Sequence, residues 1–406
     1  MKAYYFIAKR ILKSDKSDFS NNIVKIGIGT ITVGVIVMLL SVFIVRGFKY
    51  EIEHKITGFT GNLRITSVNI NESPEFNAIK IDSSIINQIL SLKEVKAINS
   101  FANKLGILKT NENLEGVVFK GIDSDYCQEC FSGEIIDGEF PIYNFDSTSN
   151  NILISKIQAN KLEIKVGDRV DAYFLHGETP RVRKYFVKGI YESGFTDFDQ
   201  MFVLLDIKSI RSLNEWTDNQ NSGYEIFLNS PSQTQNVYSK ISPLLPFDSA
   251  IESVYDINYQ IFDWLNLQDV NVIVLLTVMS IVCVITILSV LVIIIVERTS
   301  MIGILKSLGM NNRNIRKIFL LKASYIVILG IILGNAIALL LSAIQLRWSV
   351  FSLPAESYYM SKVPIKIDFF EILLIDFFIF VICMVIVYFA TTISAKIKPT
   401  KAIKYD

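Results

Sequence analysis

The sequence has few of the side chains that enzymes use for catalysis or for metal binding. Only two histidines occur in 406 residues, His54 and His176, and neither has partners at metal-ligand spacing. No G-x-S-x-G motif marks a nucleophile, and no G-x-x-x-x-G-K-S/T loop is present to cradle the phosphates of a nucleotide. These absences argue against catalysis, a metal site and nucleotide hydrolysis in this chain, so the energy for any work must come from a partner.

Cysteine is scarce as well, with four residues. Cys283 and Cys383 lie inside long apolar runs, where cysteine behaves as a small apolar residue. Cys127 and Cys130 form a C-x-x-C pair, which does not predict a zinc site because no second pair accompanies it. Two interpretations of this pair stay open: a local disulfide in an oxidising compartment, or two free thiols.

Two further signals are missing. No cleavage site of small residues follows the first apolar run, which is also too long for the core of a signal peptide, so we expect it to remain as an anchor. The segment between the first two runs lacks a basic face with interleaved aromatic residues, which argues against nucleic acid as a partner.

Apolar residues, by contrast, are abundant. Hydrophobic residues make up 51% of the chain and charged residues 19%. The hydrophobic residues gather in four runs, at 26–45, 270–296, 323–346 and 369–395. Each run is long enough to cross a hydrocarbon core of ~30 Å. The composition therefore predicts a polytopic α-helical membrane protein with four transmembrane helices.

Lysine and arginine are distributed unevenly around the four runs. They gather before the first run, between the second and third, and after the fourth, whereas few lie between the third and fourth. Positively charged flanks stay on the cytoplasmic side of a membrane. We therefore expect both termini and the 298–317 segment in the cytoplasm, and the long segment between the first two runs outside.

These runs fix the expected organisation of the chain. It comprises a cytoplasmic amphipathic segment at 1–22, transmembrane helices at 23–47, 269–297, 318–346 and 369–395, an exported domain with stalks at 48–268, a short cytoplasmic segment at 298–317, an outside loop at 347–368 and a cytoplasmic tail at 396–406. For 1–22, a solvated basic leader is the alternative to a helix lying in the inner interface.

The exported segment has the character of a soluble α+β domain. Near-alternation with β-branched and aromatic residues predicts strands at 63–68, 105–109, 114–120, 170–175, 185–191 and 224–228. Capping residues and helical spacing predict helices at 83–92, 155–162 and 232–244. A further helix, from about 257 to 296, would be ~60 Å long and would project from the membrane as a stalk.

The 297–318 stretch is a charged hinge between two apolar runs. Met301, Ile304 or Leu305, and Leu308 recur at helical spacing, so a helix over about 298–308 would carry one apolar stripe, with Lys306 off it. Gly309 follows where helices often end in the left-handed conformation, and Asn311 or Asn312 can cap the next helix. The pattern predicts a short helix at the mouth of a membrane bundle, offered to a partner.

Two polar residues fall inside the predicted spans. Asn335, in the third run, is suited to bonding across a helix interface. Asp376, in the outer third of the fourth run, is open to two interpretations: an intramembrane functional acid, or a side chain that reaches water near the end of its helix.

Several motifs, spread over nearly the whole length, identify a family. They are F-I-A-K-R-I at 6–11, G-F-K-Y-E at 47–51, K-I-T-G-F at 55–59, S-G-F-T-D-F-D-Q at 193–200, L-P-A-E-S-Y-Y at 353–359 with V-P at 363–364, and P-T-K-A-I-K-Y at 399–405. With E-R at 297–298 and I-G-I-L-K-S-L-G at 302–309, the chain resembles the MacB/FtsX-like permeases of ABC transporters. Within them it is most similar to the lipoprotein-releasing LolC/LolE type.

The resemblance implies a chain of the bacterial inner membrane with a large periplasmic α+β domain inserted between transmembrane helices 1 and 2. It also implies no cofactor on this chain, a separate cytoplasmic ATPase subunit that binds ATP and Mg, and a second permease copy or paralogue. The implied substrate is a lipoprotein, which is extracted from the membrane and handed to a periplasmic carrier.

The resemblance further implies three sets of site residues. The ATPase-coupling set is Glu297, Arg298, Met301, Ile302, Gly303, Leu305, Lys306, Leu308 and Gly309. The lipid-contact set is Val37, Leu40, Phe43, Ile44, Phe48, Leu265, Leu267 and Ile273. The carrier-docking set is His176, Gly177, Thr179, Pro180 and Arg181, in a connection that is short for a LolC-type hairpin.

Two alternative functions stay open on the sequence. One is an FtsX-like transmembrane signalling subunit that controls a periplasmic cell-wall hydrolase. The other is a MacB-like exporter component, although that type carries its ATPase on the same chain and only about 22 residues precede the first span here.

Overall fold

The computed structural model describes residues 18–394, apart from 69–74, 76, 111, 132, 145, 177–178, 354–359 and 361. Most of the predicted 1–22 segment, most of the L-P-A-E-S-Y-Y motif and the tail from 395 lie outside the described residues. The chain divides into two compact units. Of the described residues, the membrane unit holds those in 18–48, 264–351 and 363–394, and the α+β unit holds those in 49–263 and 352–362.

Four helices in the described residues are long and apolar enough to cross a membrane. They are α2 (Asp18–Thr60), α9 (Tyr259–Glu297), α11 (Asn312–Trp348) and α13 (Phe369–Ser394). α2 and α9 are each longer than a bilayer requires, because α2 continues to Thr60 and α9 already begins at Tyr259. The prediction of four transmembrane helices is confirmed.

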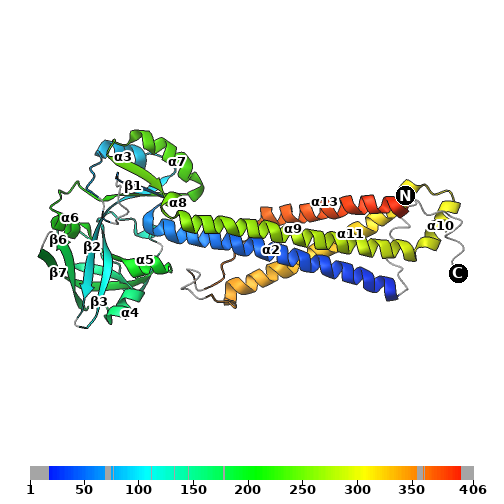
Figure 1. Cartoon of the computed structure of the whole chain (residues 1–406), viewed down its shortest axis with the longest axis horizontal. Helices are drawn as coiled ribbons and strands as arrows, with labels where there is room; N and C mark the ends of the chain where they lie inside the picture. The colour runs from blue at the N-terminus through cyan, green and yellow to red at the C-terminus, as the bar shows by residue number, and fades with distance from the viewer. Residues whose placement is uncertain are drawn as a thin grey trace. The chain divides into compact units, whose positions relative to one another are not determined.

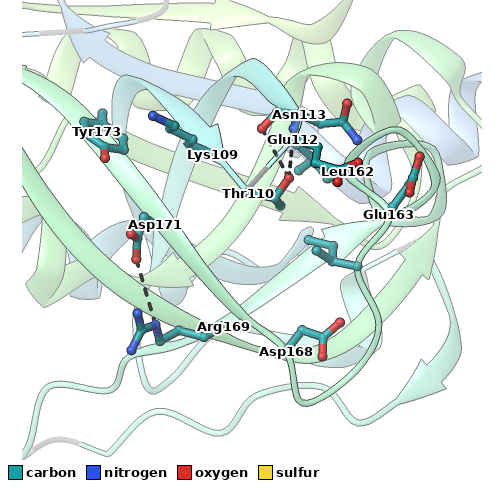
Figure 2. Close-up of a pocket in the computed structure, with 11 residues that line it drawn as sticks. Lys109, Thr110, Glu112, Asn113, Leu162, Glu163, Asp168, Arg169, Asp171 and Tyr173 are labelled. Atoms are coloured by element: carbon teal, nitrogen blue, oxygen red, sulfur yellow. Dashed lines mark hydrogen bonds and ion pairs between the residues drawn. The ribbon is translucent and has the colours of Figure 1, made fainter.

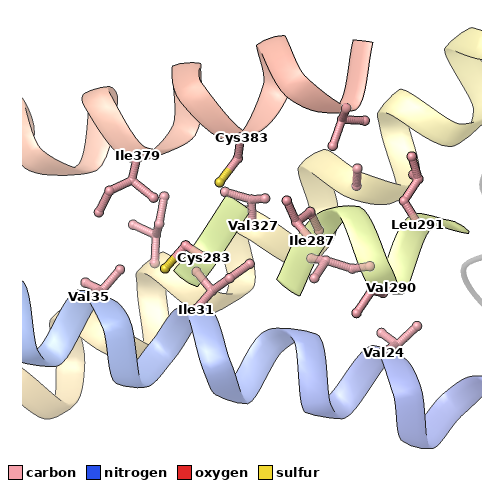
Figure 3. Close-up of a cluster of buried hydrophobic side chains, with 14 of the residues drawn as sticks. Val24, Ile31, Val35, Cys283, Ile287, Val290, Leu291, Val327, Ile379 and Cys383 are labelled. Atoms are coloured by element: carbon pink, nitrogen blue, oxygen red, sulfur yellow. The ribbon is translucent and has the colours of Figure 1, made fainter. Parts of the chain in front are cut away.

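Small residues let α2 approach its neighbours closely. A Cβ atom added at Gly34 would lie 2.6 Å from the Sγ of Cys283 on α9. One added at Gly330 on α11 would lie 2.6 Å from the Cγ2 of Ile31. Buried side chains from α2, α9, α11 and α13 form one core around these contacts (Figure 3). Cys283 and Cys383 lie in that core, as expected for small apolar residues.

The α+β unit is built on a ten-stranded sheet in its described residues. The strands are β1 (Leu63–Ser67), β2 (Val95–Lys109), β3 (Leu114–Ile122), β4 (Glu134–Gly138), β5 (Asn151–Ser155), β6 (Arg169–His176), β7 (Thr179–Glu192), β8 (Phe202–Asp206), β9 (Gly223–Leu228) and β10 (Ser249–Ser253). β6 pairs with both β2 and β7, which closes β2, β3, β8, β5, β7 and β6 into a barrel. We call this the barrel lobe.

A second lobe consists of β10, β1 and β9 with two helices, and the long strand β2 connects it to the barrel lobe. The first half of β2 pairs with β9 from Val95 to Phe101, and its last residues pair with β6 from Gly106 to Lys109. The two helices are α3 (Ser83–Leu90) and α7 (Thr234–Ile241), which lie near β1 in Figure 1. Both helices contribute buried side chains to the hydrophobic core of this second lobe.

The remaining helical elements cover the barrel lobe or link strands. They are η1 (Gln128–Cys130), α4 (Lys156–Leu162), α5 (Thr196–Met201), α6 (Ile207–Asn214), η2 (Pro231–Gln233), η3 (Ser242–Leu244) and α8 (Val254–Ile257). Side-chain caps start several helices of the α+β unit. Asp82 accepts a hydrogen bond from the Ser84 amide at α3, and Ser155 with Gln158 forms a capping box at α4.

Two secondary-structure predictions need correction. One helix over 232–244 is wrong, because η2 and η3 flank the short helix α7 and each begins at or next to a proline, Pro231 or Pro243. The strand predicted at 105–109 begins ten residues earlier, at Val95. Strands β4, β5, β8 and β10 and helices α5 and α6 were not predicted. Each is eight residues long or shorter, which is too short for periodicity alone to identify it.

Candidate functional site

The predicted coupling segment forms a short helix, α10 (Thr299–Ser307), between α9 and α11. Gly309 ends it with a φ of 85°. The Gly309 amide donates to the Lys306 carbonyl at 3.0 Å, and the Met310 amide donates to the Leu305 carbonyl at 3.0 Å. These two bonds make the Schellman ending that glycine permits at this position. Asn311 then occupies the N-cap position of α11, although its side chain makes no capping bond.

The side chains of α10 divide into a buried and an exposed set. Ile302 is 0% exposed and lies in the core of the membrane unit together with buried Gly303. Ile304 is 55% exposed and Leu308 is 79% exposed. Met301, Leu305 and Lys306 are half-buried. Ile302 and Gly303 therefore anchor α10, while the apolar pair Ile304 and Leu308, one helical turn apart, faces outward.

Glu297 and Arg298 mark the junction of α9 and α10. Glu297 is the last residue of α9 and is exposed, and Arg298 stands at the N-cap position of α10. The Thr299 hydroxyl donates to the Val296 carbonyl at 2.7 Å, so it satisfies an acceptor at the C-terminal end of α9. The turn between the two helices is thus held by local hydrogen bonds.

The predicted lipid-contact residues do not share one environment. Phe43 and Leu265 are buried, with exposed fractions of 0% and 2%, so each packs against protein. Val37, Leu40, Ile44 and Phe48 are half-buried on α2. Leu267 and Ile273 are 62% and 61% exposed on α9. They belong to an apolar outward face of α9 that continues through Val270, Val274, Val278 and Ile281.

Two quoted motifs meet at one end of the bundle. A Cβ atom at Gly47 would lie 2.5 Å from the carbonyl oxygen of Pro364, so only glycine fits there. The Lys366 amide also donates to the Phe43 carbonyl at 3.1 Å. The G-F-K-Y-E motif at 47–51 and the V-P pair at 363–364 therefore serve close packing of α2 against the segment before α13.

Polar pairs hold α13 within the bundle. The Asn335 amide on α11 donates to the Asp376 carboxylate at 2.6 Å, and Arg46 on α2 lies 2.6 Å from Glu371. The sequence singled out Asn335 and Asp376 separately, but their pairing across 41 residues was not predicted. The Asp376 carboxylate thus forms a hydrogen bond with a second membrane helix, α11.

The predicted carrier-docking residues lie at the β6–β7 hairpin. His176 pairs with Thr179, and Gly177 lies outside the described residues. Pro180 is exposed and lines an apolar groove of about 410 Å³ with Leu105, Gly106, Ile107, Lys109, Leu114, Tyr173 and Phe174. The Arg181 guanidinium lies 2.8 Å from Glu215, at the end of α6, so one member of the set is already engaged within the domain.

A polar groove of about 680 Å³ is shown in Figure 2. It shares Lys109 and Tyr173 with the apolar groove. Its charged lining residues are Lys109, Glu112, Glu163, Asp168, Arg169 and Asp171. Arg169 and Asp171 are 4.0 Å apart and both belong to β6. The groove thus carries charges of both signs, and no group of three or more metal-ligating side chains was found among the described residues.

Cys127 and Cys130 are joined in a disulfide. Cys130 is buried, and the Cys127 amide donates to the Asn99 side chain on β2 at 3.2 Å. The following residue, Phe131, reaches the aromatic cluster around Phe59 at 5.9 Å between ring centroids.

A buried ion pair was missed by sequence reasoning. The Lys120 ammonium on β3 lies 2.8 Å from the Glu225 carboxylate on β9, and both side chains are 3% exposed. Burial lowers the pKa of Lys120 and raises the pKa of Glu225, while their mutual attraction opposes both shifts. The only sequence signal for this ion pair is a single charged residue within each of two apolar strands, and that signal does not show that the two residues pair.

Four membrane helices, an α+β unit between the first two, and a short capped helix between the second and third define a membrane protein of the permease class. Two family models match the chain: the MacB-like periplasmic core domain over residues 27–244 and the FtsX-like permease C-terminal domain over residues 273–399. The chain belongs to the MacB/FtsX-like family of ABC transporter permeases.

Relatives resemble the chain over its length. The lipoprotein-releasing system transmembrane protein LolC of Neisseria meningitidis is 20% identical and covers 99% of both chains. LolE of Haemophilus influenzae is 21% identical and covers 92% of both. Among solved structures, the periplasmic region of MacB from Actinobacillus actinomycetemcomitans is 13% identical, with a TM-score of 0.35 over 51% of this chain and 95% of that one. The extracellular domain of YknZ is 18% identical, with a TM-score of 0.34 over 47% and 99%.

Proposed function

We propose that this chain is a permease subunit of an ABC transporter that extracts lipoproteins from the bacterial inner membrane and passes them to a periplasmic carrier. The observation that carries the proposal is the full-length similarity to LolC, which extends over the membrane helices, α10 and the α+β unit alike. A likeness confined to one unit would support only the broader permease class. The motifs quoted from both units point the same way.

In this proposal the energy comes from a separate cytoplasmic ATPase that binds ATP and Mg, and α10 is its docking element. The exposed pair Ile304 and Leu308 supports this role, because exposed apolar side chains on a helix favour a protein contact. The Gly309 ending and the buried Ile302 hold α10 in place, so that force applied to it reaches the bundle core. The basic flanks of the helices support a cytoplasmic location for α10 and both termini.

A second permease copy or paralogue completes the proposed transporter. The apolar outward face of α9, which includes Leu267 and Ile273, supports contact with lipid or with that second permease. On α2, the half-buried residues Val37, Leu40, Ile44 and Phe48 are further lipid-contact candidates.

Depletion in the cell tests the proposal. We expect depletion of this chain to leave lipoproteins in the inner membrane, because the proposed extraction step would be lost. The measurement is membrane fractionation followed by detection of lipoproteins in each fraction. Normal sorting under depletion would count decisively against lipoprotein release, and loss of cell-wall hydrolase activity instead would favour the signalling alternative.

A variant pair tests the coupling role of α10. Gly309→Pro cannot reach a φ of 85° and removes the amide that donates to Lys306, so it should uncouple ATP hydrolysis from release. Gly309→Ala meets nothing within 4 Å and differs only by backbone strain of about 1 kcal/mol, so it should retain most coupling. Wild-type release by purified complexes with Gly309→Pro or with Glu297→Ala would refute this role.

A further inference from the structure

The last turns of α2, residues 49–60, are held in a socket within the α+β unit. Phe59 is 1% exposed. Its ring stacks on Phe198 with 4.9 Å between centroids, and Phe202 lies 5.2 Å away. These partners come from α5 and β8, and the contacts hold the last turn of α2.

A charged group closes the socket beneath Phe59. The Lys120 Nζ donates to the Phe59 carbonyl oxygen at 2.6 Å and to both carboxylate oxygens of Glu225, at 2.8 and 2.9 Å. The same ammonium lies 4.7 Å from the centre of the Phe59 ring. Lys120 belongs to the barrel lobe and Glu225 to the second lobe, so one ammonium joins α2 to both lobes.

The Lys120 ammonium is stabilised by its position at the end of α2, although its burial costs free energy. A cation near the C-terminal carbonyls of a helix is stabilised by the helix dipole and satisfies an acceptor that the helix leaves unpaired. Burying two charges nevertheless costs about as much as their attraction returns, and apolar replacements are often equally stable. The Lys120–Glu225 pair therefore serves to position the end of α2 more than to stabilise the fold.

A loop on the barrel lobe fixes α2 a turn earlier. The Lys55 Nζ donates to the Gly194 carbonyl at 3.2 Å. That loop is itself held by Asp199, whose carboxylate accepts from the Ser193 amide at 3.1 Å and from the Ser193 hydroxyl at 2.6 Å. The S-G-F-T-D-F-D-Q motif at 193–200 thus forms one wall of the socket, which gives this motif a structural role.

We propose that Lys120 and Glu225 are positioning residues for transport, which lock the end of α2 to the barrel lobe and the second lobe so that a displacement of α2 moves both. The inference rests on the proposed function. α2 is one continuous helix from Asp18 to Thr60, so the turns held in the socket belong to the same element as the first membrane span.

The test uses the full chain in lipid nanodiscs with its ATPase. The variant is Lys120→Met/Glu225→Met, which removes both charges and leaves no unpaired buried charge. Glu225→Gln, which keeps the bond from Lys120 to Phe59, is the milder second variant. Lys188→Met/Glu139→Met is the matched control, because that pair lies 3.1 Å apart with exposed fractions of 44% and 77%.

Three quantities are measured: the melting temperature, amide hydrogen exchange of residues 49–60, and labelled triacylated lipoprotein released per ATP hydrolysed. We expect the double variant to melt near the wild type and to exchange about tenfold faster at the end of α2, as loss of a charge-assisted hydrogen bond predicts. We expect its release per ATP to fall at least about fivefold while ATP turnover continues. Glu225→Gln should give smaller changes and the control none.

Unchanged exchange in the double variant would overturn the inference, and so would faster exchange with wild-type release per ATP. A wild-type complex that hydrolyses ATP but releases no lipoprotein would instead defeat the proposed function. The exchange measurement would still decide, in that case, whether Lys120 and Glu225 hold the end of α2.

Discussion

The outward pair on α10 gives the sharpest prediction about the partner ATPase. We expect Leu308→Ala to weaken ATPase binding and Ile304→Ala/Leu308→Ala to weaken it further. Neither change should disturb the membrane unit, because the two side chains are 79% and 55% exposed. The core anchor of α10, Ile302, is untouched in both variants.

The size of the effect follows from the area that docking would bury. Complete burial of a leucine or isoleucine side chain contributes ~1.5–3 kcal/mol. Scaled to its exposed fraction, Leu308 would lose about 1–2 kcal/mol on truncation, which corresponds to roughly 5- to 30-fold in the dissociation constant. The double variant would lose about 2–3 kcal/mol, or roughly 30- to 150-fold.

The assay is titration of the purified chain in nanodiscs with the labelled ATPase subunit. Leu114→Ala is the control, because Leu114 is 66% exposed but belongs to the α+β unit. Melting temperatures measured in parallel separate docking from folding. Wild-type affinity in the double variant would refute α10 as the docking element, however stable the variant is.

Three further predictions concern the fold. Lys120→Met alone leaves the buried Glu225 without its Lys120 partner and should cost ~3–5 kcal/mol, or roughly 6–20 °C in melting temperature. Lys120→Met/Glu225→Met should instead melt near the wild type, and equal melting of the two variants would contradict this account. Burial raises the pKa of Asp199 above its ordinary 3.8, so the folded chain retains a proton that the unfolded chain releases. The stability of the wild type relative to Asp199→Asn should therefore fall as the pH rises through that raised pKa, and a difference independent of pH from 3 to about 8 would exclude the effect. Gly330→Ala should lower the melting temperature, at a cost of ~1–3 kcal/mol in stability, because the new Cβ would lie 2.6 Å from Ile31. Gly29→Ala, whose Cβ would have nothing within 4 Å, should leave the melting temperature unchanged. Similar melting of the two variants would argue against close α2–α11 packing.

The membrane architecture could be predicted because it depends on the simplest sequence signal. Runs of about 20 apolar residues have few folded alternatives to a membrane helix. The end of α10 was equally readable, since Gly309 acts through its own backbone conformation, and Asn311 occupies the predicted N-cap position although its side chain makes no capping bond. Such local signals need no knowledge of what lies across the fold.

Contacts between distant segments were not readable from one sequence. Lys120 and Glu225 are 105 positions apart, and nothing local to either residue specifies the other. The same holds for Asn335 with Asp376. Only a third of strand β2 was predicted. Its first residues pair with β9 in the second lobe and its later residues with β3 in the barrel lobe, so residues 95–104 do not alternate regularly between apolar and polar side chains. The lipid-contact set was scattered for a similar reason: a resemblance places residues along a helix but does not say which side of it is buried.

The central claim is that this chain releases lipoproteins, and reconstitution tests it most directly. Proteoliposomes would contain this chain, its partner permease where one exists, the ATPase and a fluorescent triacylated lipoprotein, with the periplasmic carrier added outside. The account predicts transfer of the lipoprotein to the carrier that requires ATP hydrolysis and is lost with Gly309→Pro. Steady ATP hydrolysis with no lipoprotein leaving the membrane would contradict it.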